Sequence, residues 1–134
     1  MIVVYAYVCG DILHKGHLLH LENCKAMGDK LIVGVLTDEA VMEKKPKPSM
    51  GFDERLDLIK ALKCVDVAIP QNIYSPCENI LNIKPNIMAE SESHSDELIE
   101  HVTNVTSSIN GRVVIMPYYK NQSSTKIKET VKNG

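Results

Sequence analysis

Residues 2–17 read IVVYAYVCGDILHKGH, and they contain a strand that leads directly into the start of a helix. Ile2–Val8 is an unbroken apolar run rich in β-branched residues, which is typical of a strand buried on both faces. After Gly10, apolar residues at helical spacing predict a helix over Gly16–Met27. A buried strand followed at once by a helix is the first half of a βαβ unit.

The same alternation continues along the rest of the chain. Further apolar strands are predicted at Lys30–Leu36, Val65–Ile69 (ended by Pro70), Asn86–Ala89 and Arg112–Met116. Helices are predicted from the N-cap Thr37 to about Lys44, over Phe52–Leu62, 75–83 and Ser95–Ser107, and over Ser123–Lys132. We therefore predict a Rossmann-like three-layer α/β/α fold with a five-stranded parallel sheet. No linker or repeat divides the chain, so residues 1–134 are predicted to form a single domain.

Composition narrows the class of protein. The chain has 134 residues, of which 44% are hydrophobic and 24% charged, as in an ordinary globular domain. A formal net charge of −2 gives no basis for binding a nucleic acid polymer or coating an anionic membrane. No basic leader precedes the first strand, and the four cysteines form no C-x-x-C pair, so we expect a cytoplasmic protein with reduced thiols.

The residues just after the first strand suggest a phosphate site, because parallel sheets bind ligands at the carboxyl ends of their strands. His14 and His17 flank Gly16 where the helix begins, and the free amides of a helix start favour an anion. Gly16 lets a phosphate approach the backbone, and imidazole donates hydrogen bonds to phosphate oxygens. Asp11 adds a carboxylate of the kind that Mg²⁺ accepts when it also holds triphosphate oxygens.

A second candidate cradle opens the last predicted helix. The hydroxyls of Ser123, Ser124 and Thr125, together with free helix amides, suit the phosphates that leave as pyrophosphate. Ordinary N-capping is the alternative for these residues. For the first motif the alternative is a zinc site made by Cys9, His14 and His17, although no fourth ligand is evident.

Two motifs resemble a known superfamily: DILHKGH at residues 11–17 and QSSTKIK at residues 122–128. They are similar to the motifs of the HxGH nucleotidyltransferases, in particular the cytidylyltransferase family and its glycerol-3-phosphate cytidylyltransferases. The resemblance implies transfer of CMP from CTP to a small phosphorylated alcohol or phosphonate by in-line attack on the α-phosphate, with release of pyrophosphate. It also implies Mg²⁺ as cofactor and a homodimer formed around the helix of Arg55.

The resemblance assigns roles to individual residues. His14 and His17 would stabilise charge on the α-phosphate, and Lys44 would draw that phosphate and the acceptor together. Arg55 would contact the acceptor. The remaining nucleotide and phosphate contacts would come from Cys9, Gly10, Asp11, Gly16, Glu90, Ser123, Ser124 and Thr125, with Asp11 also as metal ligand.

Three segments depart from the family pattern: VCGD at 8–11, AESESH at 89–94, and YYKNQSST at 118–125, which lacks the arginine and glycine of glycerol-3-phosphate enzymes. These loops contact base and acceptor in the resembling enzymes. Two alternatives therefore stay open beside the CTP reading. One is an adenylyltransferase of the same superfamily that uses ATP and a coenzyme or sugar-phosphate acceptor. The other is a catalytically degenerate nucleotide-binding module.

Overall fold

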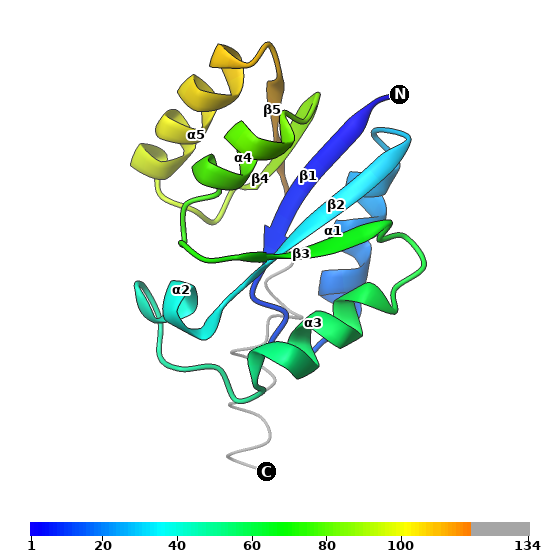
Figure 1. Cartoon of the computed structure of the whole chain (residues 1–134), viewed down its shortest axis with the longest axis vertical. Helices are drawn as coiled ribbons and strands as arrows, with labels where there is room; N and C mark the ends of the chain where they lie inside the picture. The colour runs from blue at the N-terminus through cyan, green and yellow to red at the C-terminus, as the bar shows by residue number, and fades with distance from the viewer. Residues whose placement is uncertain (119–134) are drawn as a thin grey trace.

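A computed structural model describes residues 1–118 and forms one five-stranded parallel sheet in the order β3-β2-β1-β4-β5. The strands are β1 (Val3–Val8), β2 (Lys30–Leu36), β3 (Val67–Gln71), β4 (Ile87–Ser91) and β5 (Arg112–Met116). The helices are α1 (Lys15–Lys25), α2 (Asp38–Met42), α3 (Phe52–Lys60), α4 (Cys77–Ile83) and α5 (Asp96–Ser108). The strand order reverses between β1 and β4, which lie side by side in Figure 1 although the chain separates them widely. The predicted Rossmann-like fold is confirmed.

Helices cover both faces of the sheet (Figure 1). On one face Val4 and Ala6 of β1 pack in a core with residues of α1 and α3. On the other face Tyr5 and Tyr7 pack in a second core with residues of α2, α4 and α5. Successive residues of β1 thus point to opposite buried faces, which explains why the strand is apolar throughout.

The carboxyl ends of two strands differ from the sequence-based expectation. β3 does not end before Pro70 but continues to Gln71, with Pro70 in register with Val35. β3 is an edge strand, where the amide hydrogen that proline lacks is not needed on the open side. β4 continues to Ser91, so Glu90 lies inside the strand rather than in the loop after it. The predicted helix over Ser123–Lys132 lies outside the described residues.

A buried hydrogen-bond group joins three elements across the sheet. The Tyr5 hydroxyl donates to Oε1 of Gln71 at 2.6 Å and accepts from Nδ2 of Asn79 at 2.9 Å. The side chain of Tyr5 extends across β2 to reach Gln71 of β3, and Gly34 is the β2 residue beneath it. A Cβ added at Gly34 would lie 1.9 Å from the Tyr5 hydroxyl oxygen. Only glycine leaves room for this group.

Substitution of Gly34 by alanine is expected to lower the free energy of unfolding by about 1–3 kcal/mol or more, because the buried Tyr5–Gln71 pair must move. Urea denaturation followed by far-UV circular dichroism measures the change. Gly51→Ala is the matched control, because nothing lies within 4 Å of its added Cβ, and it should cost under about 1 kcal/mol. Equal midpoints for the two variants would contradict this account of Gly34.

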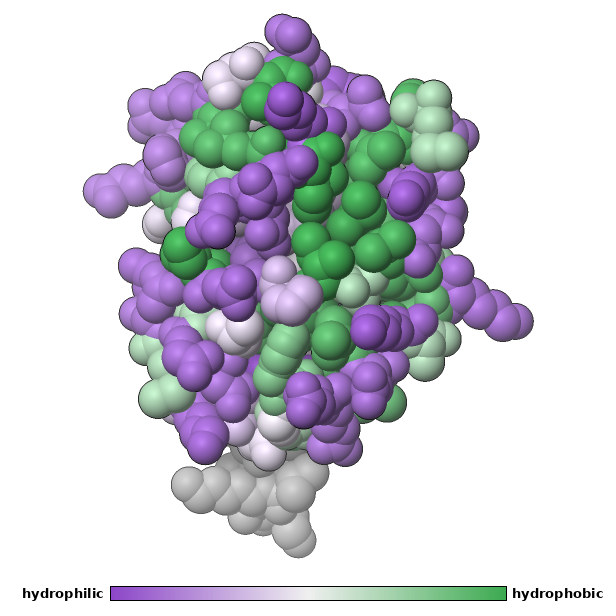
Figure 2. Space-filling view, in the orientation of Figure 1, coloured by the Kyte–Doolittle hydropathy of each residue, from purple (hydrophilic) through white to green (hydrophobic). Residues whose placement is uncertain are grey.

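Apolar side chains also reach the surface. Figure 2 shows them gathered right of centre, over the region where β1, β2 and β3 run in Figure 1. Exposed apolar residues of these strands and of the helix beside them include Val67 of β3 and Leu81 of α4.

In the described part of the chain, no helix has the length and apolar character needed to cross a membrane. The homodimer remains a prediction.

Candidate active site

A sharp turn connects the carboxyl end of β1 to α1. Gly10 has φ +75° and Ile12 has φ +54°, so the backbone enters the left-handed region twice within three residues. Glycine adopts this conformation without strain, whereas isoleucine does so at a cost. The turn places the first helical residue, Lys15, close behind the strand end, where the sheet order reverses. The H-x-G-H segment therefore starts the helix at the expected ligand position.

The two histidines of that segment form a capping box. The backbone N–H of Gly16 donates to Nδ1 of His14 at 3.0 Å, and the backbone N–H of His14 donates to Nδ1 of His17 at 3.3 Å. A ring nitrogen that accepts a hydrogen bond carries no hydrogen, so each neutral imidazole has its hydrogen on Nε2. The ring centroids are 4.1 Å apart. The spacing thus places two Nε2–H donors side by side.

Among residues 1–118, the Nε2 atom of His14 finds no hydrogen-bond partner. Within residues 1–118 it is the buried side-chain nitrogen or oxygen atom for which no partner is found. A buried donor left without an acceptor is costly, so such atoms mark places where a ligand or ion binds. An anionic oxygen at the start of α1 would satisfy this donor and the helix amides together.

Burial keeps these imidazoles neutral. It lowers the pKa of His17 to about 4, with repulsion from His14 and His20 acting in the same direction. Burial likewise lowers the pKa of His14 and of His20. At neutral pH the pair therefore donates hydrogen bonds without carrying charge. Burial also raises the pKa of the Cys9 thiol, so Cys9 is not a thiolate nucleophile.

The lowered pKa of His17 makes stability depend on pH. Below pH 6.5 the unfolded chain binds a proton at this residue, whereas the folded chain does so only near pH 4, so stability falls as pH decreases between these values. From His17 alone we expect a free energy of unfolding about 2 kcal/mol lower at pH 5 than at pH 7. Urea denaturation at both pH values of the wild type and of His17→Asn tests this. An equal pH effect in both proteins would contradict it.

Asp11 is held by the backbone of another segment. Its carboxylate is 3% exposed and accepts the N–H groups of Ser49 and Met50, each at 3.0 Å. It thereby ties the segment before α3 to the turn after β1. No group of three His, Cys, Asp or Glu side chains among residues 1–118 is placed to hold a metal ion. Cys9, His14 and His17 therefore do not form the alternative zinc site. The predicted role of Asp11 as a single carboxylate ligand of Mg²⁺ stays a prediction, and the structure adds a positioning role for it.

Arg55 is enclosed by protein. Its side chain is 0% exposed, and its guanidinium donates to three backbone carbonyl oxygens and to one carboxylate. The acceptors are Met50 O at 3.1 Å, Cys9 O at 2.6 Å, Leu36 O at 2.7 Å and Asp38 Oδ1 at 2.7 Å. The predicted acceptor contact does not fit this burial: Arg55 holds the carboxyl ends of β1 and β2 against α3, and four of its five N–H groups are engaged there.

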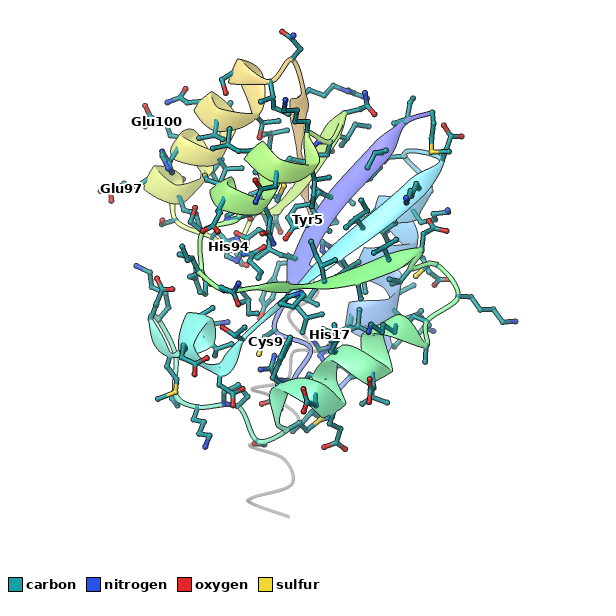
Figure 3. All side chains as sticks on the ribbon, viewed as in Figure 1. Tyr5, Cys9, His17, His94, Glu97 and Glu100 are labelled. Carbon is teal, nitrogen blue, oxygen red and sulfur yellow. The ribbon has the colours of Figure 1, made fainter. Side chains whose placement is uncertain are left out.

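Glu90 is also enclosed by protein. It is 0% exposed and accepts hydrogen bonds from the Tyr7 hydroxyl, from Nδ1 of His94 and from the Ser91 backbone N–H. The predicted direct contact of Glu90 with nucleotide does not fit this burial. His94, at the same end of the strands but on the α4–α5 side (Figure 3), was not among the predicted site residues. The spacing of Glu90 and His94 across the loop after β4 is the sequence feature that indicates the pair.

The structure places Lys44 and Gly16 among the other predicted residues. Lys44 is exposed just after α2, a helix capped by the Thr37 hydroxyl, and its role in binding the acceptor stays a prediction. Gly16 is buried in the first turn of α1, and its role in letting a phosphate approach the backbone stays a prediction. Ser123, Ser124 and Thr125 lie outside the described residues.

Comparison with known proteins shows the family to which the chain belongs. Residues 8–130 match the cytidylyltransferase-like family model. The chain is 30% identical over 131 residues to the bifunctional protein HldE of Pelobacter propionicus and 34% identical over 131 residues to that of Trichlorobacter lovleyi. These matches cover 96% of this chain but only 27% and 26% of those proteins, so the chain spans about a quarter of their length.

Solved structures also include similar proteins. The lipopolysaccharide core biosynthesis protein of Thermoplasma volcanium aligns with a TM-score of 0.76 and 30% identity, over 88% of this chain and 96% of that one. Pantoate-beta-alanine ligase of Francisella tularensis aligns with a TM-score of 0.63 and 16% identity, over 98% of this chain and 69% of that one, which shows a shared fold. The resemblance stated from the two motifs is confirmed at the level of the family.

Proposed function

The chain belongs to the cytidylyltransferase-like family, and we propose that it is a nucleotidyltransferase that transfers AMP from ATP to a sugar phosphate and releases pyrophosphate. The observation that carries this proposal is the histidine pair at the start of α1. There, the buried Nε2–H of His14 has no partner in the described structure, and Nε2 of His17 lies on the neighbouring ring. Two neutral donors and free helix amides suit the oxygens of a transferring phosphate.

The relatives support the ATP reading over the glycerol-3-phosphate and CTP reading that the motifs first suggested. They are proteins called HldE and a protein of lipopolysaccharide core biosynthesis, which favour a saccharide acceptor. CTP remains the second candidate donor, because the matching family is described as cytidylyltransferase-like. The departures from the glycerol-3-phosphate pattern at residues 89–94 and 118–125 agree with a different acceptor.

We propose direct in-line attack of the acceptor phosphate on the α-phosphorus. The thiol of Cys9 is kept protonated by burial, so it supplies no covalent nucleophile. Positioning and charge stabilisation are then what the protein contributes. His14 and His17 would donate to α-phosphate oxygens, and Lys44 would reduce the repulsion between the two phosphates.

The leaving pyrophosphate and the metal complete this proposal. Ser123, Ser124 and Thr125 are proposed to hold the pyrophosphate. Mg²⁺, when bound with ATP, would offset triphosphate charge. Because Asp11 is already engaged by two backbone amides, no step is assigned to a protein-bound metal.

Pyrophosphate release tests the proposal. The protein is incubated with Mg²⁺ and either ATP or CTP, across a panel of sugar phosphates, glycerol 3-phosphate and phosphonates. Release that requires ATP and a sugar phosphate supports the proposed reaction, whereas release only with CTP would favour the second candidate. Tight binding of a nucleotide without turnover of any acceptor would indicate the degenerate binding module instead.

A further inference from the structure

A buried polar cluster lies at the carboxyl end of β1 and β4, beside the histidine pair but not part of it. Glu90 has no exposed surface, and its carboxylate accepts from the Tyr7 hydroxyl, which lies 3.0 Å from each oxygen, and from Nδ1 of His94. Burial and the neighbouring Glu90 raise the pKa of Tyr7, so its hydroxyl stays a donor. A buried carboxylate is costly to retain in a core that apolar residues would fill. The fold and the proposed chemistry described above leave this cluster without a function.

The cluster fixes the orientation of His94. A carboxylate only accepts, so the hydrogen on Nδ1 of His94 points to Glu90, and in this tautomer Nε2 is an acceptor. The ring stacks on Tyr7, with centroids 5.4 Å apart, and meets the edge of Tyr74 at 5.8 Å. Nε2 has no hydrogen-bond partner among residues 1–118, although the side chain keeps 18% exposure. His94 therefore presents a rigidly held acceptor atom.

Charge is distributed unequally on the two sides of β1. On the β2 side, the segment that follows β2 carries three lysines, Lys44, Lys45 and Lys47. On the other side, the chain from Pro85 through Gly111, which includes β4 and the loop of His94, contains no lysine or arginine. Phosphate groups are therefore suited to the β1 and β2 side. The β4 side suits an uncharged part of the substrate that donates hydrogen bonds.

We propose that Nε2 of His94, positioned by Glu90 and Tyr7, accepts a hydrogen bond from the nucleoside part of the substrate. The donor on the nucleoside is either a ribose hydroxyl or the exocyclic amino group of the base, which present the same chemistry to an acceptor nitrogen. This inference rests on the proposed function, since it assigns a nucleoside contact within the same site. Glu90 and Tyr7 act through His94 and are positioning residues.

Equilibrium binding of ATP and three analogues tests this contact. His94→Asn keeps an N–H near the Nδ1 position that contacts Glu90 but removes Nε2, whereas His94→Gln keeps a polar atom at the Nε2 position. We expect the Kd for ATP to rise about tenfold in His94→Asn, as for loss of one hydrogen bond, and less in His94→Gln. His101→Ala, an exposed change on α5, is the control and should bind like the wild type.

The analogues are 2′-deoxy-ATP, 3′-deoxy-ATP and purine riboside triphosphate, each of which lacks one donor. The analogue that lacks the donor bonded to His94 should bind wild type and His94→Asn with equal affinity, and this identifies the donor group on the nucleoside. The proposal would be overturned if wild type and folded His94→Asn bound ATP with equal affinity. It would also be overturned if His94→Asn lost the same factor of affinity for ATP and for all three analogues. If His94→Asn fails to fold, wild-type affinity in His94→Phe, which also lacks Nε2, would overturn it. Failure of the wild type to bind either ATP or CTP would instead refute the proposed function.

Discussion

Replacing His14 with asparagine should lower kcat about a hundredfold or more and leave the free energy of unfolding within about 1 kcal/mol of the wild-type value. Asparagine is a good N-cap, and its side-chain oxygen takes the place of Nδ1 as acceptor for the Gly16 N–H. It has no counterpart to Nε2, the atom that is buried without a partner in the described structure. The variant therefore separates the donor from the cap. Steady-state pyrophosphate release and urea denaturation measure the two effects.

The control is Lys15→Ala, since Lys15 is the exposed first residue of the same helix. It should keep stability and turnover close to wild type. His17→Asn is expected to behave like His14→Asn, because it keeps an acceptor for the His14 N–H and loses Nε2. Wild-type turnover in a folded His14→Asn protein would show that Nε2 does not contact the reacting phosphate.

Replacing Arg55 with alanine should lower the free energy of unfolding by about 3–5 kcal/mol. The change removes four hydrogen bonds and leaves Asp38 and the carbonyl groups of Cys9, Leu36 and Met50 without their donor. Arg55→Lys should recover only part of this loss, because an ammonium group cannot reproduce the planar set of donors. Urea denaturation of the three proteins gives the values.

Lys60→Ala is the matched control, since Lys60 is exposed at the end of the same helix, and it should change stability by less than about 0.5 kcal/mol. Kinetics distinguish the two roles considered for Arg55. A raised KM for the acceptor with wild-type stability would restore the acceptor contact that the family resemblance suggested. Lost stability would identify Arg55 as the residue that holds the strand ends together.

The sequence predicts the fold well because the fold depends on local patterns. Apolar runs such as Ile2–Val8, separated by amphipathic helices, are sufficient to indicate a parallel sheet covered on both faces. Pro70 misled the prediction because its effect depends on whether the strand lies at an edge, which is a property of the assembled sheet. The position of β3 could be known only after all five strands were ordered.

The site was predictable to a lesser degree. The spacing of His14 and His17 was enough to place both at the start of the helix, although not to predict the capping box in which each accepts a backbone N–H through Nδ1. Arg55 and Glu90 were assigned to ligands on the family resemblance, which carries no information on their burial in this chain. Their burial arises from tertiary contacts: Arg55 donates to carbonyls of two distant segments, at Cys9 and Leu36, and Glu90 meets Tyr7 from a neighbouring strand. No local pattern indicates such convergence.

Transfer of label from α-³²P-ATP to a sugar phosphate tests the central claim most directly. With Mg²⁺ and an accepted sugar phosphate, we predict that the label appears in a nucleotide-linked sugar, with one pyrophosphate released for each molecule formed. His14→Asn should slow both products by the same factor. No labelled product from ATP or from α-³²P-CTP with any member of the acceptor panel, in a folded protein, would contradict the account.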